Sequence, residues 1–360
     1  MRSFLTVSLV IACLTSVASS QSAATLPARD DVLAVMRKTC DYQLEQQRTT
    51  PFNNGWIRSA FYTGVMALYD TTKEQKYLDA ATHWAEKGEW TPQTTPRHPE
   101  MRFADNQACT QVYAELYLLK PDERKIAPAI KMFDAQMADP KGGRVDWWWC
   151  DSLYMTPPAL VRLAKATKET RYLDFMNTMW WDACDYLQDK ETGLFYRDKR
   201  FFEKKTANGQ KTLWSRGNGW VVAGTCRVLD DLPDDYRDRQ KYIDLHKRMA
   251  AELIKLQRED GLWPPSLLDP KEFDSPETSG TAFFCYALAW GINHGTLDRA
   301  TYLPHVIKAW NGLVTKVTPE GKLGYVQKVA GEPGKVNPDD THEYAVGALL
   351  LAGSEILKIK

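Results

Sequence analysis

Two kinds of apolar segment alternate along this 360-residue chain. Segments of the first kind are short, rich in small residues and apolar nearly all round: residues 60–69, 221–229, 281–290 and 345–352. Segments of the second kind are longer and carry charges on one side: residues 77–87, 172–187 and 242–256. Apolar positions in both kinds recur with the period of an α-helix, and the pattern predicts about twelve helices. We expect the first kind to be inner helices and the second kind to be outer helices with a solvated face.

A charged turn recurs where a helix of the first kind gives way to one of the second. The sequence TKEQKYLD at 72–79 returns as TKETRYLD at 167–174, with looser versions starting at Tyr242 and Tyr302. An open stack of such hairpins would need polar capping repeats at its ends. The last segment, 344–356, is instead apolar nearly throughout, so we expect it to pack against the first hairpin. The sequence therefore predicts an all-α, closed (α/α)6 toroid in a single domain over residues 21–360.

A polar or aromatic cluster precedes each inner-type helix or forms its first turn. The clusters are NGW at 54–56, ADNQ at 104–107, WCD at 149–151, WSRGNGW at 214–220, ETSG at 277–280 and DDTH at 339–342. Because alternate helices of a toroid run in the same direction, all the clusters should meet at one rim. The residues expected at that rim are Trp56, Asp105, Asp151, Arg216, Thr278 and His342.

Asp105 and Asp151 are the carboxylates of this rim that stand in apolar or aromatic surroundings. Either could simply cap its helix, a role in which Asp is favoured and contributes about 1 kcal/mol. Asp151, however, directly follows the aromatic run WWWC at 147–150. Burial against such rings raises the pKa of a carboxyl group toward the range that a general acid requires. The pattern favours a catalytic pair over two helix caps.

The segment WSRGNGW supplies candidates for ligand binding. Its two glycines allow a sharp turn or a close approach to a ligand. Arg216 offers a planar fork to a carboxylate, and Trp214 and Trp220 offer flat faces on which a sugar ring can stack. In the alternative interpretation, both tryptophans belong to the core and Arg216 caps a helix end. The thirteen tryptophans of the chain favour a carbohydrate site.

The composition limits the classes of ligand and partner that we expect the protein to bind. Lys+Arg and Asp+Glu both number 46, so the formal net charge is zero, and no basic stripe points to nucleic acid or to an anionic membrane surface. The histidines show no metal-binding spacing, so we expect neither a metal nor a cofactor. The six cysteines after residue 20 form no C-x-x-C pair. Buried free thiols are expected, although an exported protein could oxidise a pair.

The N-terminus has the pattern of a secretory signal. An apolar run at 4–14 follows Arg2, and the small residues Ala18 and Ser20 precede a cleavage site expected after residue 20. A minor alternative is a lipoprotein box that ends at Cys13. No later apolar run approaches the roughly 20 residues of a membrane-spanning helix. The sequence predicts an exported protein, secreted or periplasmic, and leaves its oligomeric state open.

Several longer pieces of the chain, taken in order, resemble one enzyme family. They are ADNQACTQVYAELY, WWWCDSLYMTPPAL, GLFYRDKRFF, LWSRGNGWVVAG, PETSGTAFFCYALAWGI and DDTHEYAVGALLLAGSEI. These pieces resemble glycoside hydrolase family 105, the unsaturated rhamnogalacturonyl hydrolases, with the unsaturated glucuronyl hydrolases of family 88 as more distant kin. The resemblance covers nearly all of the chain after residue 20 and implies an (α/α)6 barrel.

The resemblance also implies roles for particular residues. Its two rim aspartates fall on Asp105 and Asp151, with Asp151 as the main acid/base. The residues expected to bind substrate are Trp149, Arg197, Trp214, Arg216, Trp220, Thr278 and Tyr62. Arg197 departs from the family pattern, because some relatives carry histidine after the GLFY segment, and it could change the preferred sugar or linkage.

The implied reaction is the hydration of a double bond. Polysaccharide lyases leave a C4=C5 enol ether in the uronate at the non-reducing end of an oligosaccharide. A carboxylic acid protonates C4, water adds at C5, and the hemiketal opens and releases the aglycone sugar. One alternative is an inverting glycosidase, which would need Asp105 and Asp151 roughly 6.5–9.5 Å apart. Another is a non-catalytic carbohydrate-binding protein in which the aspartates only cap helices. The sequence does not identify the aglycone.

Overall fold

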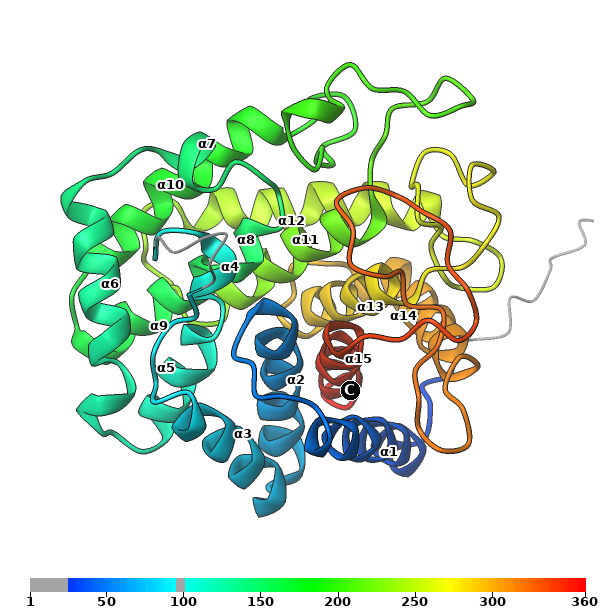
Figure 1. Cartoon of the computed structure of the whole chain (residues 1–360). Helices are drawn as coiled ribbons and strands as arrows, with labels where there is room; N and C mark the ends of the chain where they lie inside the picture. The colour runs from blue at the N-terminus through cyan, green and yellow to red at the C-terminus, as the bar shows by residue number, and fades with distance from the viewer. Residues whose placement is uncertain (1–24, 95–100) are drawn as a thin grey trace, which may run out of the picture.

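α-Helices make up nearly all of the regular structure of this chain (Figure 1). The computed structural model describes residues 25–94 and 101–360. Within those ranges twelve helices have ten or more residues, as predicted, and strand-like pairing is limited to isolated bridges. The expected signal sequence at 1–20 and the alternative site at Cys13 lie outside the described residues.

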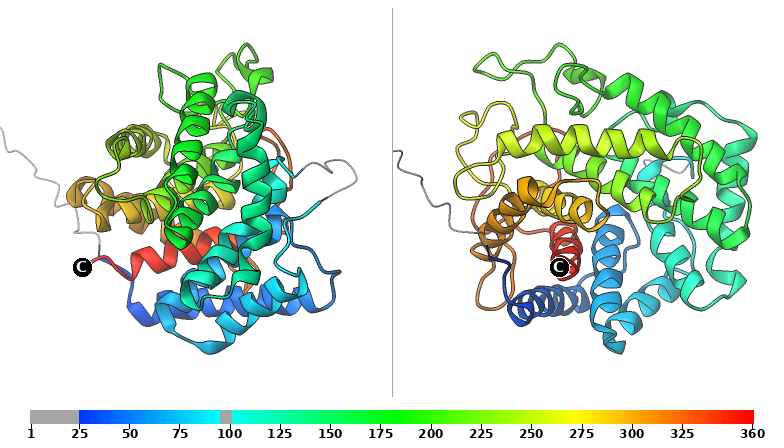
Figure 2. Two further views of the ribbon diagram at one scale, coloured as in Figure 1. Left: turned by 90° about the vertical axis from the view of Figure 1, so that its left-hand side faces the viewer. Right: turned by 180° about the vertical axis from the view of Figure 1, so that it is seen from behind.

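The inner ring consists of α2 (Trp56–Thr72), α5 (Thr110–Leu119), α9 (Pro157–Thr167), α11 (Ser215–Leu229), α13 (Thr278–Asn293) and α15 (Glu343–Ile356). Each of these helices contacts the next in chain order, and α15 returns to contact α2. Seen from behind in Figure 2, α15 lies between α2 and α13. The ring is therefore closed, which confirms the predicted (α/α)6 toroid and the predicted packing of the last segment on the first hairpin.

The outer layer consists of α1 (Arg29–Arg48), α3 (Gln75–Lys87), α6 (Ala127–Ala138), α10 (Arg171–Leu187), α12 (Arg239–Leu253) and α14 (Arg299–Val314). The short elements are α4 (Ala104–Gln107), α7 (Gly143–Asp146), α8 (Ser152–Met155), η1 (Glu123–Lys125), η2 (Lys199–Phe201) and η3 (Ile254–Leu256). Every residue of α11 is buried, whereas α12 buries six of its 15 residues. This contrast is the physical basis of the two kinds of segment, since only the outer helices keep a face in water.

The inner helices approach one another closely where small residues face each other. A Cβ atom added to Gly64 of α2 would lie 2.4 Å from the carbonyl oxygen of Gly347 in α15. A Cβ atom on Gly347 would lie 2.1 Å from the carbonyl oxygen of Ala60. Any side chain at these two positions would push the helices apart, so glycine is required where the first and last inner helices meet.

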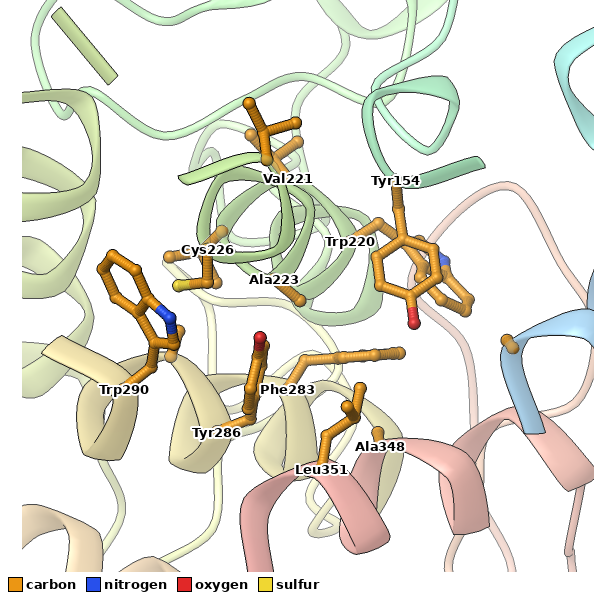
Figure 3. Close-up of a cluster of buried hydrophobic side chains, with 14 of the residues drawn as sticks. Tyr154, Trp220, Val221, Ala223, Cys226, Phe283, Tyr286, Trp290, Ala348 and Leu351 are labelled. Atoms are coloured by element: carbon orange, nitrogen blue, oxygen red, sulfur yellow. The ribbon is translucent and has the colours of Figure 1, made fainter. Parts of the chain in front are cut away.

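An aromatic cluster fills the centre of the ring (Figure 3). The Trp220 ring centroid lies 4.4 Å from that of Phe283, 4.7 Å from that of Tyr154 and 6.1 Å from that of Trp56. Such pairs each contribute about 0.5–1.5 kcal/mol beyond the burial of their area. The cluster holds helices from opposite sides of the toroid together directly beneath the rim where the inner helices begin.

The repeated TKE segment forms the same helix end twice. Lys73 and Lys168 follow α2 and α9 with φ of 56° and 64°, in the left-handed region that ends a helix. Each turn then leads from an inner helix to the next outer helix. Cys40, Cys109, Cys150, Cys184, Cys226 and Cys285 are all buried and unpaired, as expected. None of the described helices is both long enough and apolar enough to span a bilayer.

Candidate active site

A cavity of about 800 Å³ lies at the rim where the inner helices begin. Trp56 at the start of α2, Asp105 in α4, Asp151 just before α8 and Arg216 in the first turn of α11 all line it. Its aromatic walls are Trp56, Phe103, Trp148, Trp149, Tyr186 and Trp214. The structure therefore brings together four of the six residues expected at the rim, whereas Thr278 and His342 are not among the residues that line the cavity.

Asp105 lies half-buried in the first turn of the four-residue helix α4. Its carboxyl group caps no helix, and it makes no hydrogen bond or ion pair with any residue in the described part of the chain. Burial and the negative charge of Asp151 raise the pKa of Asp105 to about 7, against the opposing effect of the Arg197 cation. A carboxyl group with this pKa holds its proton at mildly acidic pH and can release it near neutrality.

Asp151 stands at the N-terminus of α8 and is 8% exposed, yet its side chain caps nothing. Its Oδ2 lies 3.6 Å from Nε of Arg197 and 3.5 Å from the thiol sulfur of Cys150. Helix capping, the alternative that the sequence allowed for both aspartates, therefore has no hydrogen bond to support it at either position. Both carboxyl groups face the cavity instead.

Arg197 comes from the loop after α10 and is fixed on three sides. Its Nη1 donates to Oδ2 of Asp198 at 2.8 Å, its guanidinium carbon lies 5.2 Å from the Trp148 ring centroid, and its carbonyl accepts from the Cys150 N–H at 2.8 Å. These contacts place Arg197 against Asp151. Arg197 therefore lines the cavity, and its nearest charged partners are carboxylates of the protein.

Arg216 holds a segment that we call the strap, residues 327–331. Arg216 Nη1 donates to the carbonyl oxygen of Gln327 at 2.7 Å and Nη2 to that of Lys328 at 2.9 Å. Trp214 Nε1 donates to Oε1 of Gln327 at 2.7 Å. The remainder of the strap, Val329 to Gly331, forms one wall of the cavity. The WSRGNGW motif therefore lines the site and also fixes the strap, and Nε of Arg216 is left buried without a hydrogen-bond partner.

Trp149 forms part of the aromatic wall of the cavity. It stacks on Phe103, with ring centroids 4.8 Å apart and planes inclined by 27°, and its ring centroid lies 4.7 Å from that of Trp148. Trp149 is almost fully buried, whereas Trp148 is 38% exposed. Trp148 is therefore the tryptophan of this run with a free face beside the cavity.

Trp220, Thr278 and Tyr62 do not line the cavity, in contrast to the sequence prediction. Trp220 belongs to the aromatic core, and Thr278 is fully buried and donates to the carbonyl oxygen of Gly324. Tyr62 donates to Gln47 and stacks on Trp84 in a separate hollow lined by α1, α2 and α3. A motif fixes where a residue stands along a helix, but the rotation of the helix decides whether its side chain faces the cavity or the core.

The site also contains residues that the sequence reasoning missed. They are Phe103, Arg144, Trp148, Met155, Tyr186, Asp198, Lys199, Arg200 and Val329–Gly331. Most come from loops or from short helices, where no periodic pattern marks them. The GLFYRDKRFF piece held the one usable signal, because its three cations, Arg197, Lys199 and Arg200, stand within four consecutive residues.

The charges of the cavity are biased toward cations. Five cationic side chains line it, Arg144, Arg197, Lys199, Arg200 and Arg216, against the carboxylates Asp105, Asp151 and Asp198. Lys199 makes no ion pair with any other residue in the described ranges. A concave site with a net positive charge attracts an anionic ligand, although the chain as a whole is neutral.

A closed helical toroid whose rim presents two carboxylates, aromatic walls and cations defines a carbohydrate-active enzyme. The chain belongs to glycosyl hydrolase family 88, whose family model matches residues 33–360. It is 36% identical over 351 residues to the unsaturated 3S-rhamnoglycuronyl hydrolase of Formosa agariphila, a match that covers 92% of this chain and 91% of the relative.

Two solved structures resemble the whole fold. A glycosyl hydrolase family 88 protein from Bacteroides vulgatus superposes with a TM-score of 0.87 at 34% identity, covering 93% of this chain and 100% of that one. A polysaccharide lyase superposes with a TM-score of 0.87 at 37% identity, covering 92% of this chain and 98% of that one. The family and its relatives confirm the predicted relationship to unsaturated uronyl hydrolases and show that the chain is a glycoside hydrolase.

Proposed function

We propose that this enzyme hydrates the C4=C5 enol ether of an unsaturated uronic acid at the non-reducing end of lyase-generated oligosaccharides. The observation that carries the proposal is the pair Asp105 and Asp151 in one cavity, with different electrostatic partners. Hydration needs one group that gives a proton to carbon and one that accepts a proton from water. The cavity offers a carboxyl group for each task. The relative from Formosa agariphila, named as an unsaturated rhamnoglycuronyl hydrolase, supports the same reaction.

The cations of the cavity suit the carboxylate of the uronate. The sequence assigned this carboxylate to Arg216, whose two terminal nitrogens here donate to carbonyl oxygens of the strap. Lys199 is exposed and unpaired among the described residues, and Arg200 pairs with Asp198 through two of its three nitrogens. We propose that Lys199 and Arg200 contact the uronate carboxylate first. Arg216 then contributes positive charge to the cavity wall without binding the carboxylate directly.

The aglycone that we propose is a 6-deoxy sugar such as rhamnose. Trp148 and Val329 are among the exposed large apolar side chains of the described structure, at 38% and 51% exposed, and both line this cavity. An apolar surface at the cavity mouth fits the methyl group of a 6-deoxy sugar better than a hydroxymethyl group. The Formosa agariphila relative is named an unsaturated 3S-rhamnoglycuronyl hydrolase, and the rhamnose in that name agrees with this choice.

The test uses purified protein and unsaturated disaccharides that differ only in the aglycone, rhamnose against galactose. Hydration removes the enol-ether ultraviolet absorbance and releases the free sugar, and the rhamnoside should react faster. The saturated disaccharide is the matched control, because an inverting glycosidase would cleave it and a hydratase would not.

Asp151→Asn is the matched protein control. A polysaccharide lyase, the activity named for one structural relative, would make absorbance rise on an intact polysaccharide. Binding without turnover would contradict the proposal.

A further inference from the structure

The stretch from α7 to the start of α8 forms one wall of the cavity from its base to its mouth. Four of its residues line the cavity: Arg144, Trp148, Trp149 and Asp151. The side chain of Asp151 is 11% exposed and that of Arg144 is 52% exposed. Between them, Trp149 is 1% exposed and Trp148 is 38% exposed. Exposure therefore rises along the wall away from Asp151, and Arg144 stands at the cavity mouth.

Two glycines place α7 directly against α10 (Figure 1). Gly142 has φ of 89°, in the left-handed region that favours glycine. A Cβ atom on Gly143 would lie 1.9 Å from the carbonyl oxygen of Met179 in α10, so a larger residue would push the two helices apart. The close approach of the backbones fixes the point from which the Arg144 side chain extends.

Asp182 and Tyr186 of α10 hold the Arg144 side chain in place. Oδ2 of Asp182 accepts from the backbone N–H of Arg144 at 2.9 Å, and Oδ1 accepts from Nε at 2.7 Å. The guanidinium carbon lies 5.5 Å from the ring centroid of Tyr186, which also lines the cavity. Nη1 of Arg144 makes no hydrogen bond with any residue in the described ranges. The guanidinium is therefore fixed on one edge and still has N–H groups to offer a ligand.

We propose that Arg144, supported by Tyr186, binds the carboxylate of a second uronate, on the sugar that follows the aglycone. This inference rests on the proposed hydration and extends its substrate from disaccharides to longer lyase products. With the unsaturated uronate at Asp151 and the aglycone at Trp148, the next sugar lies at the cavity mouth, where Arg144 stands. The planar fork of a guanidinium matches a carboxylate.

Longer lyase products carry such a carboxylate. Lyases that leave a C4=C5 uronate cut polymers in which uronates recur, so a product of more than one repeat keeps a saturated uronate beyond its aglycone. The cavity of about 800 Å³ lies in the upper part of the ~300–1,000 Å³ range of small-molecule sites. Arg144 is therefore a specificity-determining residue, which selects the length and charge of the substrate. A sulfate ester on the same sugar would offer a similar anion, and the experiment distinguishes the two.

The experiment compares three unsaturated trisaccharides that differ only in the third sugar, which is glucuronate, glucose or glucose 6-sulfate. The wild-type protein should hydrate the glucuronate compound with a kcat/KM about 2- to 5-fold above that of the glucose compound, as expected for a partly exposed ion pair. In Arg144→Gln this ratio should fall to about 1. A ratio near 1 in the wild type would overturn the inference. A faster reaction of the sulfate compound than of the glucuronate compound would overturn the choice of a carboxylate.

Two further variants serve as controls. Arg171→Gln is the matched control, because Arg171 is a similarly exposed arginine that pairs with Asp134 outside the cavity lining. Its ratio should equal that of the wild type. Asp182→Asn removes the competing carboxylate charge but keeps an oxygen that accepts from Arg144, so the ratio should stay the same or rise. A fall as large as that in Arg144→Gln would show that the placement of α7 sets the preference and not the cation, and the inference would fail.

The same measurements separate the inference from the proposed function. If the wild-type protein hydrates none of the three trisaccharides, the proposed function is wrong. If it hydrates all three with equal kcat/KM, the function stands and the inference fails.

Discussion

Arg58 and Glu343 join the first and last inner helices by a two-pronged ion pair. Arg58 Nε lies 2.8 Å from Oε2 of Glu343, and Nη2 lies 2.9 Å from Oε1. The two residues are 285 positions apart, and both side chains are largely buried. The pair lies at the junction where α15 closes the ring onto α2.

Removing one partner of this pair should destabilise the closed ring, because the other charge stays buried without compensation. We expect Glu343→Gln to lower the free energy of unfolding by about 2–4 kcal/mol in urea denaturation. The double variant Arg58→Met/Glu343→Leu should lose less than the sum of the two single variants, since it leaves no uncompensated charge. Additive losses would show that the pair does not act as a unit.

Arg216→Lys tests the strap. Lysine keeps the positive charge but cannot donate to two carbonyl oxygens from one planar fork. We expect a loss of about 1–3 kcal/mol in stability and a rise in KM, because the strap that walls the cavity is no longer fixed. Hydrogen exchange at residues 327–331 should accelerate. If KM rises while exchange and stability stay at wild-type values, Arg216 acts on the substrate and not through the strap.

Lys199→Met tests the proposed encounter with the uronate carboxylate. Lys199 is exposed and unpaired among the described residues, so its removal should leave the fold intact. We expect KM to rise several-fold while kcat changes little, and the effect should shrink at high salt, as it does for exposed charges. Lys205→Met removes a cation from the same loop outside the cavity lining and is the matched control. Equal effects of both variants would point to general surface charge.

The Asp151→Asn variant tests whether Asp151 takes part in the reaction or only caps a helix. Asparagine keeps the shape of the side chain but can neither give nor take a proton, so kcat should fall by roughly 10²–10⁴-fold. Binding of the unsaturated disaccharide, measured by calorimetry, should be retained. Asn caps a helix about as well as Asp, so a mere cap predicts nearly unchanged turnover. Turnover near that of the wild type would remove Asp151 from the mechanism.

Asp105 should make stability depend on pH in a defined direction. Its pKa is raised to about 7 in the folded protein, so the folded state binds this proton more tightly than the unfolded state does. The contribution is present at acidic pH and is lost as pH rises through about 7. Asp105→Asn should therefore gain stability over the wild type at pH above 7 by up to ~4 kcal/mol, with little gain in acid. Parallel stability curves of the two proteins would contradict the raised pKa.

The architecture was predictable because a helix that is buried on all sides needs small or apolar residues at almost every position, and this composition is visible in the sequence. The continuous apolar character of α11 and α15 identified them as inner helices, and the clusters before inner helices placed Asp105 and Asp151 at one rim. The direction of individual side chains was not predictable in this way. Trp214 and Trp220 share one motif, but Trp214 lines the cavity whereas Trp220 lies in the core.

The loop residues of the site were beyond prediction for a different reason. Lys199 and Val329 belong to connections whose shape is fixed by contacts between distant segments. The strap reaches the cavity because Arg216 and Trp214 hold Gln327 across more than 100 positions. Neither the secondary-structure preference of single residues nor the spacing of apolar positions shows which distant segments contact each other.

The closure of the ring through α15 has a consequence for how the chain acquires its fold during synthesis. When α2 leaves the ribosome, the helix that must cover Gly64 and pair with Arg58 has still to be made, about 280 residues later. Until then the apolar faces of α2 and α13 lack the neighbour that shields them, and contacts of such long sequence separation form slowly. A nascent chain of this enzyme therefore exposes apolar surface that is prone to aggregation for most of its translation. Chaperones that hold apolar segments should associate with the ribosome-bound chain until α15 emerges.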